Sequence, residues 1–162
     1  MNSWASGADA RLGGLLAALD RTYDGPSWHG PSLAEAVAGL TEAGASWRPA
    51  PDAHNAWEYA VHAAYWAWRA LTALDPETGP FGEPGENFFG RPADGHRLGD
   101  DLARLEACHR RLRTVVAALD PGRLSEVAYR SYTVADVIAG VADHHVYHAG
   151  QIRLLRRLAP EG

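Results

Sequence analysis

The stretch 141–155, VADHHVYHAGQIRLL, constrains the fold most, because apolar side chains and histidines recur in it with helical spacing. One helix face at steps of three and four carries Val137, Val141, His144, His148, Gln151 and Leu155. This face is apolar at both ends and polar in the middle. A buried polar group without a partner costs about 1–3 kcal/mol, so imidazoles on a core-facing stripe need an explanation. Two histidines four residues apart on a helix can bind one metal ion.

A second face of the same helix fits almost as well. It carries Ile138, Val141, His145, His148, Ile152 and Leu155. Spacing alone does not choose between His144 and His145. A single histidine on an apolar face is usually an ordinary core residue, so this helix by itself favours a metal site and a plain core about equally.

Apolar periodicity predicts helices over 9–23, 33–40, 56–75, 100–120 and 133–158, with a brief turn or helical piece at 41–48. Ser32, Asn55 and Thr133 are the expected N-caps. No segment alternates well enough to predict a strand, and 127–132 is too short. Four long amphipathic helices with short extra helices predict an all-α protein, an antiparallel four-helix bundle with one domain over 1–162.

The segment 76–99, rich in Gly and Pro, is predicted to be a long surface loop. A loop of this length is either a lid or binding segment, or simply mobile. Its three phenylalanines, Phe81, Phe88 and Phe89, are the expected anchors to the core.

Composition narrows the range of possible functions and partners. Lys and Arg total 15 against 20 Asp and Glu, and no long basic patch occurs, so we expect no nucleic-acid partner. No run of about 18 apolar residues predicts a membrane span, and the first 14 residues do not resemble a signal peptide. The lone cysteine, Cys108, permits no intrachain disulfide, which fits the cytoplasm.

His62, on the helix predicted from residue 56, could join the pair on the last helix. Three imidazoles with an open position make a catalytic type of metal site, because structural zinc sites normally have four protein ligands. Imidazole ligands admit zinc, nickel, copper or iron.

Three segments stand out: SWHGPSL at 27–33, HNAWEYAVHAAYW at 54–66 and HHVYHAGQI at 144–152. Through these segments, in this order, the chain resembles the DinB/YfiT-like family of metal-binding four-helix bundles. The resemblance implies the metal ligands His62, His144 and His148. The last motif of the family usually reads His-Asp-x-Tyr-His-x-Gly-Gln, so His145 occupies a position where Asp is common.

Four further residues are candidates for lining the metal cleft or holding a ligand ring: Trp28, His29, His145 and Gln151. Trp28 is equally well explained as an anchor of its loop in the core. His54, His96 and His109 are expected at the surface.

The resemblance also implies an activity. Characterised relatives include transferases and isomerases that use a low-molecular-weight thiol. We therefore expect a divalent metal ion, Zn or Ni, that binds such a thiol as thiolate for attack on a small electrophilic substrate. Metal-dependent hydrolysis is the near alternative, and a non-catalytic metal-binding stress-response protein is the distant one. Family members often dimerise, so a homodimer is expected. No catalytic residue beyond the ligands is predicted.

Overall fold

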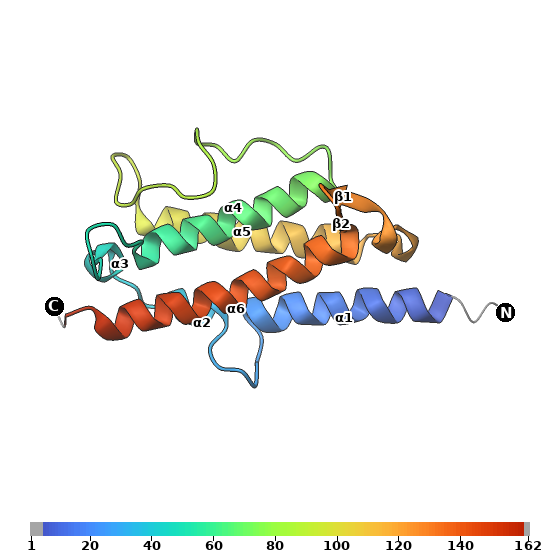
Figure 1. The fold of residues 1–162 in the computed structure, drawn as a ribbon, viewed down its shortest axis with the longest axis horizontal. Coiled ribbons are helices and arrows are strands. Elements are labelled where there is room, and N and C mark those ends of the chain that lie inside the picture. The colour runs from blue at the N-terminus through green and yellow to red at the C-terminus, as the bar shows by residue number, and fades with distance from the viewer. Residues whose placement is uncertain (1–4, 161–162) are drawn as a thin grey trace.

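The computed structural model describes residues 5–160 of the chain (Figure 1). Its long helices are α1 Ala5–Tyr23, α4 Ala56–Leu74, α5 Leu98–Ala117 and α6 Val134–Leu158. Shorter elements are α2 Leu33–Val37, α3 Glu42–Ser46, the 3₁₀ helix η1 Pro121–Ser125, and the strands β1 Val127–Tyr129 and β2 Tyr132–Thr133. The predicted all-α four-helix architecture is confirmed.

The four long helices form a closed ring, in which α1 and α4 each pack against both α5 and α6. Trp57 Nε1, in the first turn of α4, donates to Asp101 Oδ2, in the first turn of α5, at 2.8 Å. These two helices therefore run in the same direction, because the loop between them returns along the bundle, while α1 and α6 run the opposite way (Figure 1). The pair α4 and α6 is antiparallel, and it carries the three candidate ligands.

Capping fixes where the helices begin. The side chain of Asn55 accepts from the Glu58 N–H, and the Glu58 carboxylate accepts from the Asn55 N–H. Ser32 and Thr133 form the same reciprocal box at α2 and α6. These boxes satisfy backbone donors that the first helical turn leaves free, so the three predicted starts are confirmed.

The expectation of no strand was wrong for a small antiparallel hairpin, in which Val127 pairs with Thr133. Arg130 lies in its turn with φ 54°, in the left-handed region. The strands have three and two residues, and α6 starts directly after the second. Such strands are too short to show alternation in a sequence.

The apolar core has two parts. One part includes Trp57, Leu105 and Ile152, and the other includes Leu19 and Ile138. On α6, the core residues up to Ala142 belong to the part that includes Leu19 and Ile138. The core residues from Ala149 onwards belong to the part that includes Trp57 and Ile152. The histidines of α6 lie between these positions, where the apolar packing is interrupted.

The loop between α4 and α5 is tied down. Phe81 and Phe89 are buried, as expected, and so is Arg91. The Arg91 guanidinium donates to Asp101 Oδ2 at 2.6 Å and to Glu83 Oε1 at 2.8 Å. The loop is therefore held against the start of α5 by a buried ion pair as well as by aromatic contacts. Among residues 5–160, no helix is long and apolar enough to cross a membrane.

Candidate metal centre

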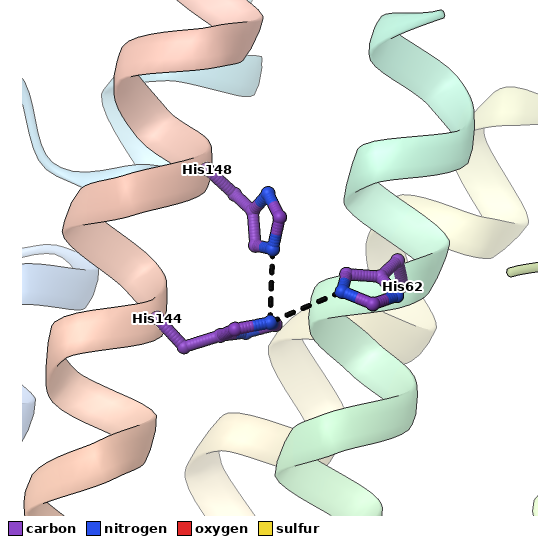
Figure 2. A group of neighbouring side chains, drawn as sticks. All are labelled: His62, His144 and His148. Atoms are coloured by element: carbon purple, nitrogen blue, oxygen red, sulfur yellow. Dashed lines mark hydrogen bonds between the residues drawn. The ribbon is translucent and has the colours of Figure 1, made fainter. Parts of the chain in front are cut away.

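Three imidazoles from two helices meet inside the bundle (Figure 2). His144 and His148 lie one turn apart on α6, and His62 faces them from α4. His144 Nε2 is 3.1 Å from His62 Nε2 and 2.8 Å from His148 Nε2. All three ligand atoms lie within 4.8 Å of one another. Nitrogens bound to a tetrahedral ion at about 2.0–2.1 Å are roughly 3.3 Å apart, so the cluster has the size that such an ion needs.

Hydrogen bonds on the far side of two rings determine which nitrogens face inward without a proton. His62 Nδ1 lies 2.7 Å from the Asn87 carbonyl oxygen, and His148 Nδ1 lies 2.6 Å from Gln151 Oε1. Both oxygens can only accept, so each Nδ1 carries the proton and each Nε2 presents a lone pair.

His144 cannot satisfy both of these lone pairs, because its Nε2 carries at most one proton. His144 Nδ1 is buried and has no hydrogen-bond partner within residues 5–160. The three converging nitrogens have too few protons to satisfy one another by hydrogen bonds. Their free lone pairs can instead bind a cation. The residues therefore fit a metal ion.

The environment keeps the rings neutral. Burial, and then the neighbouring imidazoles, lower the pKa of His144 to about 3. Burial and the proximity of His62 likewise lower the pKa of His148 to about 4. Burial also lowers the pKa of His62, although its bond to Asn87 partly offsets the effect. Neutral imidazole is the form that binds metal.

The loop between α4 and α5 supplies one wall of the site. The Phe88 ring is stacked between His62, with centroids 3.9 Å apart, and His54, at 3.7 Å. The Asn87 side chain accepts from Trp66 Nε1 at 3.0 Å. Sequence reasoning missed Asn87 and misplaced Phe88, because neither lies in a periodic segment whose contacts could be inferred.

Gln151 supports a ligand ring directly, as predicted, and His54 supports one through Phe88. Gln151 bonds to His148 and also donates to the Tyr59 hydroxyl at 3.3 Å. His54 was expected at the surface, and its side chain is indeed 41% exposed. Its Nδ1 also lies 2.9 Å from Glu58 Oε2, and its ring stacks on Phe88. The sequence did not predict this stacking because Phe88 comes from a loop far along the chain.

His145 lies elsewhere. It is fully buried, and its Nδ1 is 3.3 Å from Thr22 Oγ1 on α1. Its ring is 5.4 Å from that of His109, which stacks on Tyr23 at 3.7 Å. His109 is only 3% exposed, which corrects its expected surface position. The two histidines belong to a buried polar cluster between α1, α5 and α6.

Trp28 and His29 do not reach the imidazoles. Trp28 is 97% exposed, so it neither anchors its loop nor lines a cleft. His29 lines a shallow depression with Val146 and Leu154 of α6. Their loop, between α1 and α2, lies on the side of the bundle away from α4 (Figure 1). The prediction that Trp28 and His29 line the metal cleft was therefore wrong.

A second group of potential ligands consists of Glu83, His96 and Asp101. Arg91 and Arg104 already contact its two carboxylates, at distances from 2.6 to 3.5 Å. These guanidinium groups provide the positive charge that a metal would bring. The histidine cluster is the better candidate.

An open groove of about 460 Å³ runs from His144 along α4 and α6 to the hairpin. Its walls are largely apolar and include Trp66, Val137 and Tyr129. A small molecule can therefore approach His144 from this side.

No curated protein and no solved structure was found to match the chain. A family model described as the DinB superfamily matches residues 27–152, which include the three converging histidines and the loop over them. The chain belongs to the DinB superfamily.

Proposed function

We propose that the protein is a metal-dependent enzyme whose ion is held by His62, His144 and His148. The observation that carries the proposal is the convergence of three neutral imidazoles, whose Nε2 atoms have too few protons to satisfy their lone pairs by hydrogen bonds to one another. Zinc and nickel suit such a donor set. Three protein ligands leave a position open for a reactant.

We further propose that the reaction transfers a low-molecular-weight thiol to an electrophilic small molecule. A divalent ion lowers the pKa of a thiol or water molecule that binds to it. Within residues 5–160, no carboxylate is hydrogen-bonded to the three rings. A thiol, with an ordinary pKa of about 8.5, needs less help from a base than water, at about 15.7.

The overall step is a substitution at carbon. The sulfur forms a bond to the electrophilic carbon, the leaving group departs with its electron pair, and the thiol proton passes to solvent. Asn87 and Gln151 accept from Nδ1 of His62 and His148, which keeps the Nε2 atoms of these two rings unprotonated and holds the rings in place. The groove beside His144 is mainly apolar and suits the carbon body of a small substrate.

Cys108 is a poor candidate for the reacting thiol. It lies on α5, whereas the three imidazoles come from α4 and α6, and burial raises the pKa of its thiol to about 11. We therefore propose that the reacting thiol comes from solution. A free thiol reactant is most available in a reducing compartment, and we propose the cytoplasm as the location.

Cobalt substitution tests the proposal. Adding 2-mercaptoethanol to the cobalt protein should shift its visible spectrum and release a proton. The thiol should then be consumed on addition of 1-chloro-2,4-dinitrobenzene, with turnover lost in His62→Ala and retained in His96→Ala. If thiol leaves the spectrum unchanged and none is consumed, ester hydrolysis is the next activity to assay. If His62→Ala only lowers thermal stability and neither reaction occurs, the ion is structural.

We also propose a homodimer. The outer side of α6 exposes Tyr147, Leu154 and Leu158 at 65%, 57% and 54%. Large apolar side chains grouped on one surface favour association.

A further inference from the structure

The groove beside His144 carries two cations at its far end. Arg69 of α4 and Arg130 of the hairpin both line it. Their guanidinium carbons lie 5.3 and 5.2 Å from the centroid of the Tyr129 ring. Tyr129 thus gathers both guanidinium groups at the hairpin.

Neither arginine is neutralised by a carboxylate. Among residues 5–160, no Asp or Glu oxygen lies within 4.0 Å of a nitrogen of Arg69 or Arg130. The groove does contain one acidic residue, Asp136, but its carboxylate caps α6. It accepts from the Thr133 N–H at 2.9 Å and from the Thr133 hydroxyl at 2.6 Å.

Elsewhere in the chain, the buried Arg91 forms ion pairs with Asp101 and Glu83. Arg69 is half-buried against apolar walls and has no such partner. A guanidinium presents a planar fork of N–H donors that matches carboxylate and phosphate oxygens. The pair of arginines is therefore suited to an oxyanion.

The length of the groove sets the size of a ligand. Arg69 follows His62 by seven residues on α4, which is about 10 Å along the helix axis. Ala70 and Gly140, which also line the groove, have small side chains or none and leave room in it. A ligand that reaches from one end to the other is elongated, with a mainly apolar body.

We propose that this groove binds an elongated molecule whose carboxylate or phosphate is held by Arg69 and Arg130 while its other end lies beside His144. The assignment of the reacting group at His144 rests on the proposed function. The assignment of the oxyanion end rests only on the groove and its two arginines.

The test uses a matched pair of probes, 8-mercaptooctanoate and the neutral 8-mercaptooctan-1-ol. Binding to the cobalt protein is followed by the visible spectrum, and binding to the metal-free protein by tryptophan fluorescence. The wild type should bind the carboxylate at least about tenfold more tightly than the alcohol, because hydrogen bonds to a charged group are worth about 1.5–3 kcal/mol. 8-Mercaptooctyl phosphate distinguishes phosphate from carboxylate as the preferred oxyanion.

Arg69→Gln should lower the affinity for the carboxylate about tenfold and leave the affinity for the alcohol unchanged. Arg97→Gln is the charge-matched control, because Arg97 is exposed and precedes α5, outside the groove. Gly140→Leu should weaken all the probes by filling the groove. A Cβ at Gly140 meets no atom within 4 Å, so this variant should fold.

The two proposals fail in different ways. If the cobalt spectrum responds to all the probes but Arg69→Gln changes no dissociation constant, the thiol site stands and the oxyanion site is overturned. If the spectrum never responds but the metal-free protein binds 8-mercaptooctanoate in a manner that depends on Arg69, the oxyanion site stands and the thiol function falls. Equal affinity of the wild type for the carboxylate and the alcohol overturns the oxyanion site.

Discussion

His144 and His145 are adjacent in the chain but face different halves of the bundle. His144 Nε2 lies 3.1 Å from His62 on α4, whereas His145 Nδ1 lies 3.3 Å from Thr22 on α1. Successive residues on a helix are about 100° apart, so one residue of register separates the candidate metal centre from the buried polar cluster.

This separation predicts unequal effects of two alanine substitutions. His144→Ala should reduce metal affinity by at least about 100-fold, because it removes one of three ligands. His145→Ala should leave one ion per chain but lower stability, because a fully buried side chain is lost. Elemental analysis of untagged protein and a competition titration measure both. One ion per chain at full affinity in His148→Ala would rule out the ligand assignment.

Gln151 should tune the affinity without being a ligand. Gln151→Leu removes the acceptor that holds His148 Nδ1 at 2.6 Å, and changes of this kind typically cost about 10- to 100-fold in metal affinity. Tyr59→Phe removes only the 3.3 Å bond to Gln151 and should cost much less. A chromophoric chelator gives both constants, and equal losses in the two variants would contradict the role of Gln151.

Arg91 should couple the loop to the metal centre. Arg91→Met leaves Asp101 buried without its main partner, which costs about 3–5 kcal/mol of stability. It also releases the segment whose Asn87 carbonyl holds His62, so metal affinity should fall as well. Urea unfolding and metal titration check the two effects. Arg104→Met, which alters a half-buried arginine of the same network, should cost less in both measurements.

Acid should destabilise the metal-free protein. Burial lowers the pKa of His109 to about 4 from 6.5. Below pH 6.5 the unfolded state therefore binds more protons at His109 than the folded state does. The contribution of His109 to the free energy of unfolding is therefore fully present above pH 6.5 and is lost as the pH falls towards 4. The loss amounts to about 3 kcal/mol.

The substitution His109→Phe should flatten that part of the pH profile, because Phe keeps a ring against Tyr23 but binds no proton. Chemical denaturation between pH 4 and 7 measures the slope. His29→Phe is the control, since His29 is exposed. An unchanged slope in His109→Phe would show that His109 does not contribute.

The proposed homodimer predicts a mass of twice 17.5 kDa by light scattering. Leu154→Glu should yield the monomer, because it places a charge on the exposed apolar side of α6. Val127→Glu, at a residue 67% exposed on the hairpin, should leave the dimer intact. A monomeric wild type across the micromolar range would contradict the proposal.

The local features of the fold could be predicted from the sequence because their causes are local. Ser32, Asn55 and Thr133 cap helices through atoms within three residues. Apolar spacing revealed the long helices, and a four-residue step placed His144 and His148 on one face of α6. The resemblance to a family then indicated His62 as the third ligand, and the position of Gln151 one turn past His148 on the same face indicated that it could hold a ring.

Only the tertiary structure decided what depends on contacts between distant segments. The Asn87 carbonyl and the Phe88 ring reach His62 from an irregular loop, and no periodicity predicts where such a loop lies. His109 is buried because Tyr23 covers it. The groove with Arg69 and Arg130 exists only because the hairpin lies against the end of α4. Spacing along a helix determines which residues share a face, whereas packing between helices determines what that face meets.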